Sequence, residues 1–177
     1  NLILISSFFL IMSSIFDIFK KSRLSLPRII SHLSFGFLIL FIGLNHNFSI
    51  EKDFNLKLGE AKIIDDYEFA LLDLKLSQET NYKAVVGKLE VNNSNTMKSR
   101  ILYPEIRIYD NPQTLTYEAS IQTNFLGDHY LTMSNIDRSE YYNIKFQHKP
   151  LMIWIWISVI LLSFGGLLSL FKNAKNN

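Results

Sequence analysis

Three apolar runs lie near the two ends of the chain, and a long polar stretch separates the second run from the third. A membrane-spanning helix needs about 20 apolar residues to cross a hydrocarbon core of about 30 Å. We therefore expect transmembrane helices over residues 1–19, 29–45 and 150–171. The first run is short for a bilayer and contains Asp17 near its end, so we expect this span to be truncated at its N-terminal side.

The second run carries one ionisable side chain, His32, in an otherwise apolar and serine-containing stretch. On a helical wheel His32, Gly36 and Gly43 fall within about 40° of one another. This spacing predicts a groove floored by glycine beside the imidazole, which would admit a flat group or another helix. In the third run, Ser158, Gly165 and Ser169 form a similar stripe of small residues, which favours close packing against the other spans.

Between the spans, residues 46–149 alternate apolar and polar positions, which is typical of half-buried β-strands. A change of phase at Leu71 and Leu72 predicts a bulge within one strand. The turn signals are 78–81, 92–95, 110–112 and 127–128. The predicted strands are 67–76, 82–91, 105–109, 115–121, 129–133 and 141–146. These features predict an integral membrane α-helical protein with an inserted all-β domain, either a small barrel resembling an OB fold or a sandwich.

The excess of positive charge lies outside the β stretch. The loop 20–28 contains Lys20, Lys21, Arg23 and Arg28, and the tail 172–177 contains two more lysines, whereas residues 46–149 carry more acids than bases. Basic loops usually stay on the cytoplasmic side of a membrane. We therefore expect a cytoplasmic loop and tail, with the β domain on the opposite, periplasmic or equivalent, side.

The search for catalytic motifs excludes several classes of chemistry. The chain has no cysteine, which argues against a disulfide scaffold or a thiolate metal site. No phosphate loop, His-Glu-x-x-His pair or Gly-x-Ser-x-Gly elbow is present. Of the four histidines, we interpret His129 and His148 as structural or solvated, while His46 could cap the second span or meet a ligand.

His32 has the strongest functional signal, because an imidazole within a membrane helix needs a partner. Three roles are compatible with the residues themselves: a structural hydrogen bond to another span, a proton relay in a transporter, or axial ligation of haem iron. The predicted glycine groove would give a porphyrin a flat, apolar approach.

Six segments carry a resemblance to a known family: 31–36, 47–53, 81–91, 103–109, 149–156 and 165–168. Occurring in this order, they together resemble the C-terminal portion of the cytochrome c maturation protein F (CcmF) family. The resemblance covers nearly the whole chain, with one departure: Ile106 stands where the family usually has lysine in Pro-Glu-Lys-Arg.

The resemblance implies a subunit of a membrane haem lyase, which joins haem to apocytochrome c. It implies that His32 is an axial ligand to the iron of an intramembrane b-type haem, with Gly36 and Gly43 lining the groove and the second axial ligand outside this chain. The fragment alone is not expected to be active. Arg107 and Tyr109 are candidate contacts with partners, since arginine pairs with carboxylates and propionates.

The implied partners are other subunits of the cytochrome c maturation system, apocytochrome c and a haem carrier protein, with no nucleic acid. The implied location is the bacterial or mitochondrial inner membrane, with the β domain on the periplasmic or intermembrane side. The alternative hypothesis is a non-enzymatic membrane anchor that presents a β domain for protein contact, as in a transporter or sensor module.

Overall fold

The computed structural model describes residues 2–19, 26–94, 98–136 and 139–176. The chain forms two compact units. One contains residues 1–49, 124–127 and 149–177, and the other contains residues 50–123 and 128–148. Most of the predicted basic loop, residues 20–25, lies outside the described residues.

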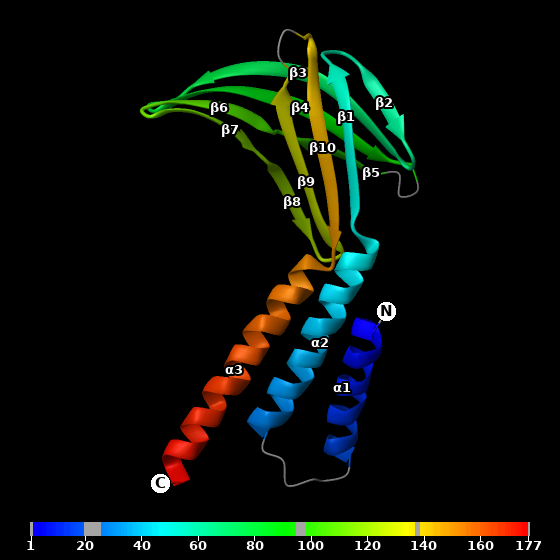
Figure 1. Ribbon diagram of the computed structural model, residues 1–177, viewed down its shortest axis with the longest axis vertical. Helices are drawn as coiled ribbons and strands as arrows, with labels where there is room; N and C mark the ends of the chain where they lie inside the picture. Colours follow the sequence, from blue (N-terminus) through cyan, green and yellow to red (C-terminus); the bar gives the residue numbers. More distant parts are fainter. Residues whose placement is uncertain (1, 20–25, 95–97, 137–138, 177) are drawn as a thin grey trace. The chain divides into compact units, whose positions relative to one another are not determined.

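The first unit holds three helices, α1 (Leu2–Phe19), α2 (Leu26–Phe48) and α3 (Met152–Asn176). All three are long and apolar enough to cross a membrane. The three predicted helices are therefore present, although α2 begins three residues earlier and ends three residues later than the predicted span 29–45. Helix α2 contacts both α1 and α3 (Figure 1).

Close contacts between these helices occur at glycines, where a side chain would not fit. A Cβ at Gly36 would lie 2.8 Å from Ile11 Cγ1 and 3.3 Å from the Ile11 backbone nitrogen of α1, and one at Gly43 would lie 2.9 Å from Leu4 Cδ2. A Cβ at Gly165 of α3 would lie 3.0 Å from the Ser31 backbone nitrogen of α2. Small residues allow such close approach of helix backbones in a membrane.

The predicted packing role of the small residues in α3 agrees with this geometry at two of the three positions. Ser158 is buried, its hydroxyl donates to the Trp154 carbonyl oxygen at 2.8 Å, and Gly165 faces Ser31. Of the two occupants predicted for the groove along Gly36 and Gly43, a flat group or another helix, the structure has a helix, α1.

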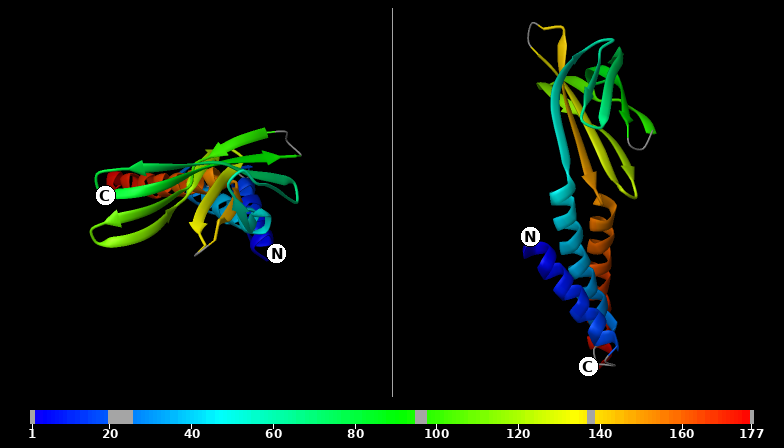
Figure 2. Two further views of the ribbon diagram at one scale, coloured as in Figure 1. Left: turned by 90° about the horizontal axis from the view of Figure 1, so that it is seen from above. Right: turned by 90° about the vertical axis from the view of Figure 1, so that its right-hand side faces the viewer.

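The second unit contains ten strands in the part of the chain that the structure describes. Figures 1 and 2 show two groups of strands in this unit that run across each other. The strands are β1 (Ile50–Lys57), β2 (Ala61–Ile64), β3 (Tyr67–Gln78), β4 (Tyr82–Asn93), β5 (Lys98–Leu102), β6 (Glu105–Asp110), β7 (Gln113–Glu118), β8 (Ser120–Asn124), β9 (Gly127–Asn135) and β10 (Tyr141–Pro150).

These strands form two sheets with a shared core. The four-stranded sheet has the order β1-β10-β9-β8, and the second sheet has the order β2-β3-β4-β6-β7 with β5 paired to β4. Strand β4 pairs with β5 over residues 89–93 and with β6 over residues 82–86. The core residues are Phe54, Leu56, Tyr67, Phe69, Leu71, Leu89, Val91, Leu102, Ile106, Leu131, Met133, Ile144 and Phe146.

All six predicted strands are present, one of them as two shorter strands, and the described part of the chain has three further strands. The bulge lies where the phase change predicted it, as the register between β3 and β4 shifts between Leu71 and Asp73. The predicted strand 115–121 is divided between β7 and β8, and β1, β2 and β5 were not predicted. Two sheets packed around one core form a sandwich, which is one of the two forms that the sequence predicted.

Adjacent glycines in α3 provide a matched test of helix packing. Replacing Gly165 by leucine should lower the free energy of unfolding by about 1–3 kcal/mol, because the new side chain would overlap the Ser31 backbone. Replacing Gly166, whose Cβ would meet nothing within 4 Å, should change it by less than about 0.5 kcal/mol. Denaturation in detergent, followed by circular dichroism, measures both; equal losses would contradict the packing described here.

Candidate functional site

His32 lies at one end of an exposed strip of α2, beside the contact with α1. Its side chain is exposed, as are those of Phe35 and Ile42, which follow it three and ten residues later at about 60° and about 80° around the helix. An accessible imidazole thus lies at one end of an otherwise apolar strip. Gly36 and Gly43 face α1 and lie within about 40° of His32 around the helix, so this strip adjoins the contact with α1.

His32 also borders a small polar pocket between α1 and α2. Ser14 and Asp17 of α1 line this pocket together with Arg28, Ile29 and His32 of α2. The Ser14 hydroxyl is engaged within its own helix, where it donates to the Leu10 carbonyl oxygen at 2.8 Å. The arrangement gives His32 polar neighbours on the α1 side and apolar neighbours along the open strip.

His46, at the opposite end of α2, lines a different and wider pocket with Leu2, Ile3, Gly43 and Asn47. The nearby amide of Asn47 donates to the Gly43 carbonyl oxygen at 2.8 Å, and the Ser49 hydroxyl donates to the Asn45 carbonyl oxygen at 2.6 Å, so both residues bond carbonyls at this end of the helix. The two histidines of α2 therefore lie in separate surroundings, and the capping role considered for His46 stays a prediction.

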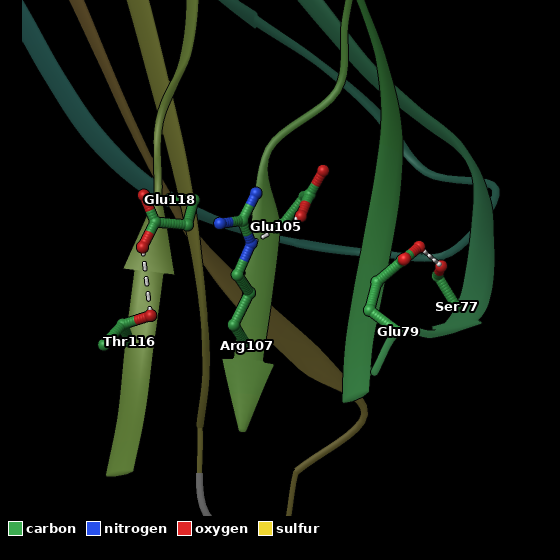
Figure 3. Close-up of polar contacts among 6 residues, drawn as sticks. All are labelled: Ser77, Glu79, Glu105, Arg107, Thr116 and Glu118. Atoms are coloured by element: carbon green, nitrogen blue, oxygen red, sulfur yellow. Dashed lines mark hydrogen bonds and ion pairs between the residues drawn. The ribbon is translucent and has the colours of Figure 1, made fainter. Parts of the chain in front are cut away.

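Arg107 and Tyr109, the predicted partner contacts, lie on β6 in the second sheet. Arg107 Nε donates to Glu105 Oε2 at 2.8 Å, and the guanidinium lies 4.7 Å from the centre of the Tyr82 ring. The Tyr82 and Tyr109 rings are themselves 5.3 Å apart. Figure 3 shows the terminal nitrogens of Arg107 extending beyond its contact with Glu105.

Neighbouring strands add acidic groups to this face of the sheet. Arg107 is in register with Thr116 of β7, and Glu105 is in register with Glu118. Thr116 donates to Glu118 Oε1 at 3.0 Å, as Figure 3 shows. Hydrogen bonds to Glu105 and Tyr109 raise the pKa of Arg107 above its ordinary value, so its charge is permanent. The structure therefore presents a fixed, half-buried cation framed by aromatic rings and carboxylates.

The β unit also holds a cluster that the sequence did not predict, formed by Arg100, His129 and His148. The His129 and His148 rings stack with their centres 4.5 Å apart, and Arg100 Nη1 lies 2.7 Å from His129 Nδ1. His129 is buried, with 6% of its surface exposed. The interpretation of His129 as structural agrees with this burial, whereas the solvated role considered for His148 does not, since its Nδ1 is buried.

Burial sets the protonation of this cluster. Loss of hydration lowers the pKa of His129 to about 3, and the positive charge of Arg100 acts in the same direction. Burial also lowers the pKa of His148, opposed by a hydrogen bond to the Asp128 backbone. Both rings are therefore neutral at neutral pH. Among the described residues, no group of three or more histidine or acidic side chains could hold a metal ion.

Comparison with known proteins assigns the family. A family model described as "CcmF C-terminal beta-sandwich" matches residues 47–150, which is more than half of the chain. The chain belongs to the CcmF family. Its fold, three long apolar helices with a β-sandwich domain, agrees with the fold class expected from the sequence and with that family description.

Curated CcmF proteins and one solved structure extend the match beyond the sandwich. The chain is 28% identical over 141 residues to the cytochrome c-type biogenesis protein CcmF of Escherichia coli K12, covering 80% of this chain and 22% of that protein. It is 27% identical over 172 residues to the Pseudomonas fluorescens CcmF, covering 90% and 26%. A solved structure of "Cytochrome c Heme Lyase CcmF" matches with a TM-score of 0.62 and 17% identity, covering 80% of this chain and 24% of that one.

These matches define both the relationship and its extent. Because the identity to the solved structure is low, this likeness shows only that the two chains share a fold. The chain spans about a quarter of the length of the curated relatives that it matches. It therefore corresponds to the C-terminal region of CcmF.

The histidine cluster of the β unit predicts a loss of stability in acid. The unfolded chain binds a proton at His129 near pH 6.5, whereas the folded chain does so only near pH 3. Between these values the unfolded state holds more protons, so stability should fall as the pH falls, by up to about 1.4 kcal/mol per pH unit. Urea titrations of the protein in detergent across this range measure the slope.

Two variants test whether His129 causes this change of stability with pH. Replacing His129 by glutamine removes the titrating group and should flatten the dependence, while replacing Tyr130, whose hydroxyl bonds Asp128 Oδ2 at 3.1 Å, by phenylalanine should leave it. A slope unchanged in the glutamine variant would show that other groups cause the loss.

Proposed function

We propose that this chain is the C-terminal part of a membrane haem lyase subunit for cytochrome c maturation, in which His32 supplies one axial ligand of an intramembrane b-type haem. The observation that carries the proposal is the exposed imidazole at the end of an open apolar strip, in a chain of the CcmF family. The relatives' names supply the link to cytochrome c biogenesis, and the name of the protein in the solved structure supplies the link to a haem lyase.

The residues around His32 fit such a ligand. An axial ligand needs a nitrogen that is accessible from an apolar surface, and His32 is exposed beside Phe35 and Ile42. The apolar strip would exclude water from one side of the ring, while Ser14, Asp17 and Arg28 provide polar surroundings on the other. When bound, the haem would supply one-electron redox chemistry. Gly36 and Gly43 face α1, so their predicted role beside a haem stays a prediction.

The second axial ligand would come from outside these 177 residues, and so would the remaining machinery of ligation. We therefore expect this segment to be inactive alone. By analogy with CcmF, we place it in a bacterial or mitochondrial inner membrane, with the loop 20–28 and the tail on the inner side and the β domain on the periplasmic or intermembrane side. The distribution of basic residues supports this orientation.

We assign the β domain to docking. The proposed partners are other subunits of the maturation system, apocytochrome c and the haem carrier protein. Arg107 is the proposed anchor, because the Glu105 contact and the Tyr82 and Tyr109 rings hold its guanidinium in one orientation on an accessible face. A preorganised guanidinium can bind a carboxylate or propionate with little further loss of side-chain freedom.

The two histidines of α2 offer a direct test of the haem ligand. In the complete complex, replacing His32 by alanine should remove the low-spin haem absorption band, because the iron would lose an axial nitrogen. Replacing His46 by alanine, in the same helix but in a different pocket, should leave the band unchanged. Spectra of the purified, dithionite-reduced complexes measure this. A band that survives the His32 substitution would favour the non-enzymatic anchor instead.

A second pair of variants tests docking. Replacing Arg107 by alanine should reduce co-purification of the complete protein with its maturation partners, by about tenfold for a desolvated charged contact of about 1.5 kcal/mol. Replacing Lys75, an exposed base of β3, by alanine should have little effect, since exposed ion pairs contribute little. Equal recovery of partners with both variants would remove Arg107 from the interface.

A further inference from the structure

The turn between β8 and β9 carries two adjacent, strongly exposed apolar side chains. Phe125 is 71% exposed and Leu126 is 75% exposed. Single apolar residues are common on protein surfaces, but a neighbouring pair at the tip of a turn is not required by turn geometry. Two other described turns of the β strands have polar or turn-forming residues at their tips, Asp65 with Asp66 and Asn111 with Pro112.

The turn is formed without help from these two side chains. Asn124 Oδ1 accepts hydrogen bonds from the backbone nitrogens of Leu126 at 2.9 Å and Gly127 at 3.1 Å. An asparagine that bonds the backbone two residues ahead is sufficient to close such a turn. Neither apolar side chain is buried in a core, so their identity needs another explanation.

The turn belongs to the same compact unit as the three apolar helices. The Leu151 backbone nitrogen donates to the Leu126 carbonyl oxygen at 2.9 Å. The indole Nε1 of Trp154, in the first turn of α3, donates to the Phe125 carbonyl oxygen at 3.0 Å. These two bonds hold the turn beside the first residues of a candidate membrane span, Met152–Phe171.

The residues around this end of the helices have the composition of a membrane interface. Trp154 and Trp156 are both exposed, as is Phe48 at the end of α2. Tryptophan is enriched where a span leaves the hydrocarbon, because its ring is apolar and its N–H is polar. Here the Trp154 N–H donates to the Phe125 carbonyl oxygen of the turn. This bond places the turn next to the apolar residues at the start of α3.

We propose that Phe125 and Leu126 insert into the interfacial layer of the lipid bilayer, where the headgroups meet the acyl chains. The turn then forms a lipid-binding surface additional to the three spans. The supporting observations are the exposure of both side chains, the turn hydrogen bonds that do not need them, and the two hydrogen bonds that hold the turn against the start of the candidate span. This goes beyond the proposed haem function, and its failure would leave the role of His32 unaffected.

Because the chain has no native cysteine, one spin label can be placed at a time. The Leu126→Cys variant is labelled with a nitroxide, and the protein is reconstituted into nanodiscs of palmitoyl-oleoyl phosphatidylethanolamine and phosphatidylglycerol. The matched control is Leu58→Cys, an exposed leucine in the turn after β1. Electron paramagnetic resonance then measures how often each label meets oxygen, which concentrates in lipid, and a nickel chelate, which stays in water.

We expect the ratio of oxygen to nickel accessibility to be at least about threefold higher at position 126 than at position 58, as for a group within the interfacial layer. A ratio equal to that at position 58 would show that the turn lies in water. Low accessibility to both reagents would show that protein covers it, and either outcome overturns the proposal. Should the label at 126 prevent folding, Phe125→Cys gives the same reading, because only the backbone of Phe125 makes a hydrogen bond.

Discussion

Close approach of backbones at glycine is the constraint on which the helical unit depends. Lipid tails are as apolar as the helices, so no hydrophobic driving force brings spans together within a bilayer. Gly36 and Gly43 bring α2 against α1, and Gly165 brings α3 against Ser31 of α2. These contacts use two sides of α2. His32 is exposed at the edge of the α1 contact, where it shares a pocket with Ser14 and Asp17 of α1.

The histidines illustrate how position in the fold decides what an imidazole can do. His32 is exposed on a helix, near the exposed Phe35 and Ile42. His129 is buried between the β sheets, stacked on His148 and close to Arg100, so its nitrogens are already occupied or enclosed. A neutral, buried imidazole that contacts another ring contributes to packing of the sandwich, and its pKa reflects that burial.

Much of the fold could be predicted from the sequence because its periodicities are strong. The three apolar runs predicted α1, α2 and α3, and the change of phase at Leu71 predicted the bulge between β3 and β4. Strand β5 was missed because it is short and polar at its start, and β2 because it has only four residues. Strand β1 does alternate at Phe54 and Leu56, a signal that could have identified it.

Less of the site than of the fold could be predicted from the sequence. The wheel position of Gly36 and Gly43 predicted a groove but could not decide what fills it, because that depends on the packing of α1. The contact of His129 with His148 and Arg100 depends on which strands are neighbours, and nothing in the local sequence gives this. The same holds for the bond from Trp154 to Phe125, which joins residues far apart in the chain.

If His32 binds haem iron, the reduction potential of the haem in the complete complex should depend on the side chain at this position. Exchange of His32 for methionine would replace an imidazole by a thioether and keep a ligand at the same place. Thioether ligation raises the potential of haem iron. A redox titration should therefore show a higher midpoint potential than in the unaltered complex. An unchanged potential with full haem content would contradict the claim.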